Sequence, residues 1–199
     1  MSVADFFSAL RIFLAPIFFI VFFIPQWFGV GGVQTAWILF PLFVFMEFTD
    51  FLDGYYARKF KTVSDFGKLF DPFADVLANL TVLFSFVLSG YLPALLFIVI
   101  LYREMGIMFV RMLASRKGVA IGARKGGKLK TVLYIVAAGF SLLLECATRL
   151  GFSLGDLTNM ARTINLGLYI IAVTVSVLSF IDYLVHFSSV LRPAEKQNK

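Results

Sequence analysis

Residues 12–46 carry no charged side chain, and this uncharged stretch limits the folds that the chain can adopt. A helix needs about 20 apolar residues to cross the hydrocarbon core of a bilayer, so the stretch is too long for one crossing. Pro25 and the glycine cluster that follows it predict a break between two helices. We therefore expect membrane-spanning helices at about 5–25 and 33–57.

The composition of the whole chain agrees with a membrane protein of several spans. Of its 199 residues, 60% are hydrophobic and 25 are phenylalanine, and the mean hydropathy of +0.88 excludes an ordinary soluble domain. The only cysteine, Cys146, excludes an intrachain disulfide. The first apolar stretch lacks a basic segment before it and a small-residue cleavage site, so we expect no cleavable signal peptide.

A second uncharged run, 76–102, permits either one tilted helix or a hairpin that turns near Gly90. Basic residues precede and follow this run. A single crossing would place the two basic groups on opposite faces of the membrane, against the tendency of basic residues to stay on the cytoplasmic side. The hairpin keeps both groups on one side, and it predicts helices at about 65–89 and 92–116.

Two further helices, at about 127–149 and 160–190, complete the predicted fold. The fold class is all-α, a polytopic membrane protein with six transmembrane helices and both termini cytoplasmic. Residues 1–191 form one transmembrane domain, and 192–199 form a polar C-terminal tail. The net charge of +6 then reflects topology, and no nucleic acid is expected as a partner.

Polar residues at the edge of this hydrophobic sequence form the most informative motif. The sequence DFLDGYYARKFKTVSDFGKLFDPFAD has the spacing Asp50-x2-Asp53-Gly54-x2-Ala57-Arg58-x8-Gly67-x3-Asp71-x3-Asp75. Steps of three and four residues place neighbouring carboxylates on one face of a helix. Charge this dense beside hydrocarbon is costly unless it serves a function, and four carboxylates suit Mg²⁺ or Mn²⁺.

This motif resembles the signature of the CDP-alcohol phosphotransferases, integral membrane enzymes of phospholipid synthesis. The resemblance extends over the chain in its length and six-helix layout. It implies a reaction in which a CDP-linked lipid or alcohol meets an acceptor hydroxyl, a phosphoester forms and CMP leaves. It also implies a cofactor of Mg²⁺ or Mn²⁺, as two ions, and a homodimer.

The resemblance assigns a role to each motif position. Metal ligands would be Asp50, Asp53, Asp71 and Asp75, and Asp75 would also be the general base that takes the proton of the acceptor hydroxyl. Glycine leaves room for a nucleotide against the helices, and arginine can make a two-point contact with phosphate. The residues expected to bind CDP are Asp50, Gly54, Ala57, Arg58, Gly67 and Asp71.

Basic residues after the second run point to the acceptor. Arg103 and Arg111 are eight residues apart and share a helical face, and Arg103 lies deep in its span. Glu104 projects about 100° from Arg103, so an anion bound in a cavity is the attractive partner for Arg103. Lys128 and Lys130 lie about 200° apart around their helix, and we choose Lys128 as the residue that faces the site.

These residues resemble the members of the family that use glycerol 3-phosphate, which carry an Arg-Glu pair on the fourth helix and Gly-Lys-x-Lys-Thr at the start of the fifth. A basic pocket suits that dianion. The acceptor phosphate-binding residues would then be Arg103, Arg111 and Lys128. Positive-inside topology is the alternative explanation of the basic residues.

The N-terminus matches the family less closely. The usual Asn-x-Leu-Thr-x-x-Arg-Ile is here Asp5-Phe6-Phe7-Ser8-Ala9-Leu10-Arg11-Ile12. Arg11 is retained and Ser8 replaces threonine, whereas Asp5 and Phe7 depart from the pattern. A contact of Arg11 with phosphate and a purely topological role both stay open.

The expected function is transfer of the phosphatidyl group of CDP-diacylglycerol to glycerol 3-phosphate, within the lipids of a bacterial cytoplasmic membrane and with the active site facing the cytosol. Alternative acceptors are inositol phosphate, serine and phosphatidylglycerol, and another alternative is transfer of a CDP-linked amino alcohol to diacylglycerol. An ion-coupled transporter is the alternative outside this class. It is disfavoured because the acids cluster at helix ends and no internal repeat is visible.

Overall fold

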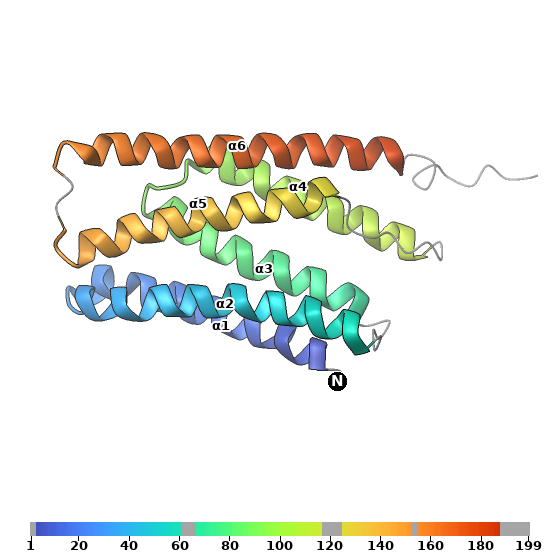
Figure 1. Cartoon of the computed structure of the whole chain (residues 1–199), viewed down its shortest axis with the longest axis horizontal. Coiled ribbons are helices and arrows are strands. Elements are labelled where there is room, and N and C mark those ends of the chain that lie inside the picture. The colour runs from blue at the N-terminus through green and yellow to red at the C-terminus, as the bar shows by residue number, and fades with distance from the viewer. Residues whose placement is uncertain (1–2, 61–66, 117–124, 153–154, 188–199) are drawn as a thin grey trace, which may run out of the picture.

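The structure is a computed structural model that describes residues 3–60, 67–116, 125–152 and 155–187. Within these ranges the side chains of 3–5, 50, 51, 53–60, 68, 69 and 125–128 lie outside the description. The described residues form the predicted all-α fold, and Figure 1 shows the order of its helices. The helices are α1 (Val3–Phe28), α2 (Gly32–Phe60), α3 (Gly67–Leu88), α4 (Ala94–Arg116), α5 (Lys125–Arg149) and α6 (Leu157–His186).

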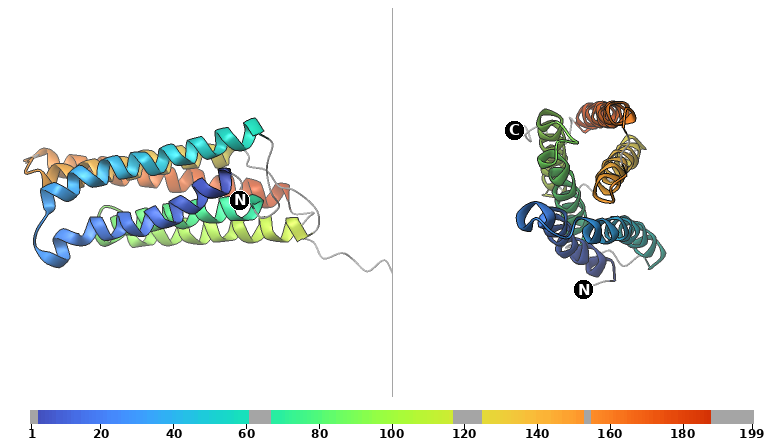
Figure 2. Two further views of the ribbon diagram at one scale, coloured as in Figure 1. Left: turned by 90° about the horizontal axis from the view of Figure 1, so that it is seen from below. Right: turned by 90° about the vertical axis from the view of Figure 1, so that its left-hand side faces the viewer.

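The helices run up and down along one long axis, so that each is antiparallel to the next (Figure 1). The starts of α1, α3 and α5 and the ends of α2, α4 and α6 therefore lie at one end, which we call the motif end. The connections α1–α2, α3–α4 and α5–α6 lie at the opposite end, which we call the far end. The two further views in Figure 2 show the same arrangement from below and end-on.

Four helix boundaries differ from the prediction by three or four residues, and one of them is the end of α2, at Phe60 and not at about 57. Helix α1 continues through Pro25 to Phe28, because the Pro25 carbonyl still accepts the Gly29 N–H at 2.9 Å and the chain turns only where Gly29 and Gly31 adopt φ of 69° and 82°. Helix α6 begins at Leu157, before the predicted start, and ends at His186. The predicted tail, 192–199, lies outside the described residues.

The predicted hairpin between the third and fourth helices is confirmed. Helix α3 ends at Leu88, and Gly90 turns the chain with a φ of 77°. The N–H groups of Tyr91 and Leu92 both donate to the Phe86 carbonyl, at 2.9 and 3.1 Å, and so close the end of α3. Because the turn is at the far end, the backbones of Lys68 at the start of α3 and of Arg116 at the end of α4 both lie at the motif end.

Five of the six helices are long and apolar enough to cross a membrane, and α4 is not among them. Helix α4 carries Arg103, Glu104 and Arg111 within its length. Arg103 and Glu104 are 4% and 6% exposed, so these charges face the interior of the bundle and not its surroundings. Large apolar side chains cover the outer surfaces of the helices instead, as is typical of a protein in lipid.

The core is built from aromatic and small side chains that interlock between helices. Helix α1 packs against α2 and α3, α5 packs against α6 and α2, and α4 packs against α6 and α3. Phe18 and Phe22 of α1 are fully buried, and the Phe22 ring meets the edge of Phe86 from α3 with ring centres 5.7 Å apart. This contact holds α1 against α3 toward the far end.

A partly buried polar cluster ties the helices together at the far end. The Arg149 guanidinium pairs with Glu145 at 2.7 Å, and it donates to the Thr35 hydroxyl and to the Phe22 carbonyl, each at 2.7 Å. The Tyr91 hydroxyl donates to the other Glu145 oxygen at 2.9 Å. Burial, followed by the Glu145 charge, raises the pKa of Tyr91, so this hydroxyl keeps its proton in neutral solution. Arg149 therefore connects α1, α2 and α5.

Replacing Arg149 with alanine is expected to lower the free energy of unfolding by about 3 kcal/mol, because Glu145, whose side chain is only 15% exposed, would lose its counter-ion. Thermal unfolding of the detergent-solubilised protein measures the effect. Arg162→Ala removes an exposed arginine of α6 and serves as the matched control, with an expected change within about 0.5 kcal/mol. Equal unfolding temperatures for the two variants would contradict a structural role for the cluster.

Candidate active site

Asp71 and Asp75 of the motif lie one turn apart near the start of α3, as the spacing predicted, and both are partly exposed. Helix α1 fixes both carboxylates. The Ser8 hydroxyl donates to Asp71 Oδ1 at 2.8 Å, and Arg11 Nη1 lies 2.5 Å from Asp75 Oδ1. Ser8 and Arg11 are 0% and 4% exposed. Arg11, which the N-terminal family pattern retains, and Ser8, which replaces its threonine, thus contact two aspartates of the motif, a pairing that the sequence reasoning missed.

The α2 half of the motif is placed only by its backbone. Asp50, Asp53, Gly54, Ala57 and Arg58 all lie on α2, close to its end, but their side chains are outside the described residues. Helix α2 ends and α3 begins at the motif end (Figure 1). Gly67 is the first residue of α3 and is buried. The helical placement of the motif is as predicted, and its contacts with CDP stay predictions.

The described carboxylates fit the chemistry that a divalent metal needs. Asp71 and Asp75 offer hard oxygen ligands on one side of α3, at the end of the bundle where α2 brings the backbone of Asp50 and Asp53. Among the described side chains no group of three potential ligands gathers, and two of the four predicted ligands lie outside that part of the chain. The four-carboxylate site therefore stays a prediction.

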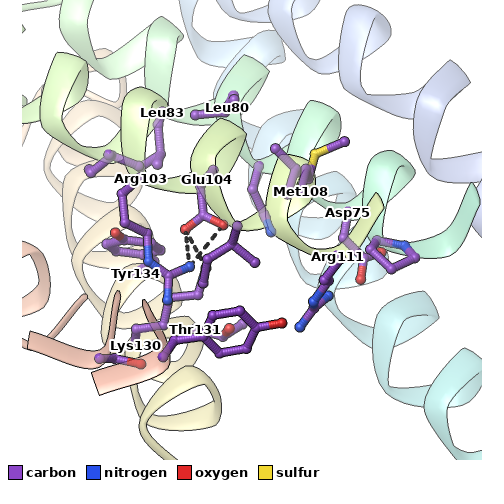
Figure 3. A pocket seen from close by; sticks show the side chains of 17 residues that line it. Asp75, Leu80, Leu83, Arg103, Glu104, Met108, Arg111, Lys130, Thr131 and Tyr134 are labelled. Carbon is purple, nitrogen blue, oxygen red and sulfur yellow. Dashed lines mark hydrogen bonds and ion pairs between the residues drawn. The ribbon is translucent and has the colours of Figure 1, made fainter. Parts of the chain in front are cut away.

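A cavity of about 240 Å³ opens beside Asp75, between α3, α4, α5 and α6. Its polar lining contains both Asp75 of the motif and basic residues of α4 and α5. In the view of Figure 3, Asp75 and Arg111 lie on one side of the cavity, and Arg103, Glu104 and Lys130 lie on the other. Arg103 and Arg111 thus face one cavity, as their eight-residue spacing predicted. Pro72, Asn79, Thr131, Tyr134, Ser179 and Tyr183 contribute further to the lining.

The expectation that Glu104 would turn away from Arg103 is wrong. Arg103 Nη1 donates to both Glu104 oxygens, at 3.0 and 3.1 Å. The two Cα positions differ by about 100° around the helix, but both side chains are long and bend toward the cavity, where they meet (Figure 3). Both groups are buried, so each serves as the counter-ion of the other.

Lys130 is the lysine of the fifth helix that the structure shows in the cavity. Its ammonium pairs with Glu104 Oε1, and it lies 5.5 Å from the centre of the Tyr134 ring. The side chain of Lys128, which the sequence analysis preferred, lies outside the described residues. Helical geometry limited the choice to one of the two lysines, but it gave no direction for α5 relative to α4.

Three buried donors belong to residues that line the cavity and have no partner. Within the part of the chain that the structure describes, Arg103 Nη2, Arg111 Nε and the Tyr183 hydroxyl have no hydrogen-bond acceptor. A buried donor without an acceptor is strongly unfavourable, so such groups usually serve a ligand or bound water. With Lys130, three cations line this cavity, and two of them, Arg103 and Lys130, share the carboxylate of Glu104. The arrangement suits an anion with several acceptor oxygens, such as a phosphate.

Comparison with known proteins shows the family of the chain. A family model described as CDP-alcohol phosphatidyltransferase matches residues 1–178. A CDP-diacylglycerol–glycerol-3-phosphate 3-phosphatidyltransferase of Treponema pallidum is 42% identical over 96% of this chain and 92% of its own length. A Bacillus subtilis protein of the same name is 36% identical over 67% and 72%. A probable phosphatidylglycerophosphate synthase of Mycobacterium tuberculosis is 32% identical over 71% and 66%.

Proposed function

Because this chain belongs to the CDP-alcohol phosphatidyltransferase family, we propose that it transfers the phosphatidyl group of CDP-diacylglycerol to glycerol 3-phosphate. The products are phosphatidylglycerol phosphate and CMP. One observation carries the choice of acceptor: Asp75 and three cations line the same cavity. The proposed base therefore lies where an acceptor held by its phosphate would place its hydroxyl.

The residues of the cavity have two roles, binding of the acceptor phosphate and proton transfer. Arg103, Arg111 and Lys130 bind the acceptor phosphate, and Lys128 remains a proposed contact beside them. Asp75 takes the proton of the acceptor hydroxyl. The oxygen then attacks the phosphorus that bears the diacylglycerol, and the bond to CMP breaks. Arg11 holds the Asp75 carboxylate, which limits its rotation relative to the acceptor.

Enzymes of this family generally depend on a divalent metal. Asp71 and Asp75, together with Asp50 and Asp53 of α2, are the residues that would hold Mg²⁺ or Mn²⁺, and we propose two ions. When bound, the metal offsets the negative charge of the pyrophosphate and stabilises the departing CMP. The CDP moiety is proposed to lie against α2 and α3, where Gly54 and Gly67 leave space and Arg58 reaches a phosphate.

Removing divalent metal is expected to abolish the reaction. A chelator in excess should reduce CMP release to background, and added Mg²⁺ or Mn²⁺ should restore it, because carboxylates alone would repel the pyrophosphate. The measurement is CMP release by the purified protein in detergent. Unchanged release after chelation, with residual metal measured as absent, would contradict the proposed cofactor.

The arrangement in the membrane follows from the fold. We propose that all six helices cross the bilayer, α4 included, since its charges face the cavity and not the lipid. The motif end, with both termini, lies in the cytosol, and the membrane is the bacterial cytoplasmic membrane. Residues 1–191 form the transmembrane domain with 192–199 as its tail, and the enzyme is a homodimer, which the family resemblance supports.

Product formation from alternative acceptors tests the proposed reaction. The purified protein receives CDP-diacylglycerol with glycerol 3-phosphate, inositol phosphate, serine or phosphatidylglycerol, and a separate assay offers a CDP-linked amino alcohol with diacylglycerol. Only glycerol 3-phosphate is expected to give rapid CMP release together with a labelled lipid. Equal rates with all acceptors would contradict the proposal, and ion flux in liposomes without CMP release would indicate a transporter.

A further inference from the structure

We propose that Glu104 is a positioning residue that ties Arg103 of α4 to Lys130 of α5 and so forms a clamp for a phosphate monoester. The inference rests on the proposed function, because it concerns the acceptor side of the same cavity. Glu104 is 6% exposed, and both of its oxygens accept hydrogen bonds from Arg103 Nη1, while one of them also pairs with Lys130. A single carboxylate therefore bridges two helices.

Arg103 is held at two of its three nitrogens, and this fixes the direction of the third. Nε donates to the Ser176 carbonyl of α6 at 3.3 Å, and Nη1 is used by Glu104. The guanidinium is planar, so these two anchors determine where Nη2 points. Nη2 is the donor that has no partner among the described residues, and Arg103 lines the cavity. Glu104 thereby orients Nη2, although its own hydrogen bonds are with Nη1.

Lys130 depends on Glu104 for its place in the cavity. It lies in the second turn of α5, near the positive end of the helix dipole, where a cation is disfavoured. Its long side chain is otherwise free to extend toward water at the motif end, as lysines near bilayer surfaces commonly do. The Glu104 carboxylate offsets the unfavourable helix dipole and holds the ammonium back from the water at the motif end. Without it, we expect the ammonium to leave the cavity.

A ring of contacts across three helices supports this interpretation. The Tyr134 hydroxyl, on the helix that carries Lys130, donates to the Ser176 hydroxyl at 2.6 Å, and Ser176 also receives Arg103 through its carbonyl. The sequence of contacts Arg103–Glu104–Lys130–Tyr134–Ser176 closes on itself. The cavity wall is therefore fixed before any ligand arrives, and preorganisation of this kind reduces the entropy lost on binding.

Glu104→Gln tests the clamp, because glutamine keeps the size of the side chain and removes its charge. The KM for glycerol 3-phosphate is expected to rise about tenfold, while the KM for CDP-diacylglycerol stays within about twofold. The displacement of Lys130 is expected to outweigh the attraction from one additional uncompensated positive charge. An unchanged or lower KM for glycerol 3-phosphate would overturn the proposal.

A double-mutant cycle separates positioning from general structural damage. If Glu104 acts through Lys130, then Lys130→Gln raises the same KM, and the double variant is no worse than the worse of the two single variants. Independent effects that multiply in the double variant would overturn the proposal. Glu145→Gln is the matched control, since Glu145 is also a carboxylate paired with an arginine, but at the far end. It is expected to lower thermal stability with both KM values unchanged.

Binding of inorganic phosphate without CDP-lipid distinguishes failure of the clamp from failure of the proposed reaction. Phosphate is expected to raise the unfolding temperature of the wild-type protein, and to raise that of Glu104→Gln less at the same concentration. A wild-type protein that binds phosphate but makes no lipid product would refute the reaction and leave the clamp intact. Equal stabilisation of both proteins would refute the clamp, whatever the activity.

Discussion

Replacing Asp75 with asparagine is expected to lower kcat by about 10²- to 10⁴-fold while binding of CDP-diacylglycerol largely survives. An amide has nearly the shape of a carboxylate but cannot accept the proton of the acceptor hydroxyl. Asp75 belongs to the motif and lines the cavity together with Arg103 and Arg111. Its loss therefore affects the attack of the acceptor hydroxyl on the CDP-lipid. Initial rates of CMP release measure kcat, and binding of labelled CDP-diacylglycerol measures affinity.

The control for Asp75→Asn is Asp156→Asn, which makes the same chemical change at an exposed residue preceding α6, at the far end. This variant is expected to keep wild-type kcat. Because Arg11 pairs with Asp75, thermal unfolding should accompany the kinetics, and a modest decrease for Asp75→Asn is expected. Retention of more than about a tenth of the wild-type kcat would contradict the assignment of Asp75 as the base.

Replacing Arg103 with alanine is expected to raise the KM for glycerol 3-phosphate by about 10- to 100-fold, with a much smaller change for CDP-diacylglycerol. A charge-assisted hydrogen bond contributes about 1.5–3 kcal/mol, and each 1.4 kcal/mol corresponds to tenfold in affinity. The Arg103 side chain supplies the Nη2 donor, which has no partner among the described residues. Arg103 is 4% exposed, so water cannot readily take its place as the donor. Steady-state kinetics with each substrate varied in turn provide the measurement.

Arg103→Lys gives the informative comparison, because it keeps the charge and loses the planar fork that contacts Ser176 and Glu104 together. We expect a KM between those of the wild type and the alanine variant. Arg162→Ala, an exposed arginine of α6 at the far end, is expected to leave both KM values unchanged. If Arg103→Ala left the acceptor KM at the wild-type value, the acceptor site would lie elsewhere in the molecule.

Helix positions were predictable because hydropathy and charge act locally along the chain. The lack of charge over 12–46, the glycines after Pro25 and the basic residues on both sides of 76–102 placed the eight boundaries of the first four helices within three residues. The end of α6 was predicted least accurately, at about 190 and not at His186. Helix α1 passes Pro25 because a bilayer-embedded helix tolerates proline when its neighbours pack against it.

Helical periodicity also predicted which residues share a face. The spacing of Asp71 and Asp75 gave their common side of α3, and the spacing of Arg103 and Arg111 gave their common cavity. Periodicity gives no contact between helices that are distant in sequence. The pairs Ser8–Asp71 and Arg11–Asp75 join residues more than sixty positions apart, and only the packing of α1 on α3 produces them.

The sequence alone determined the class of fold, the motif with its carboxylates and the basic character of the acceptor region, since these depend on composition and on spacing within single helices. Only the tertiary structure decided which charges are paired. Glu104 meets Arg103 because both side chains bend into one cavity, and Lys130 joins them because α5 packs with its neighbours in one rotation about its axis. Buried ion pairs depend on side-chain reach and helix orientation, and neither is fixed by position along the chain.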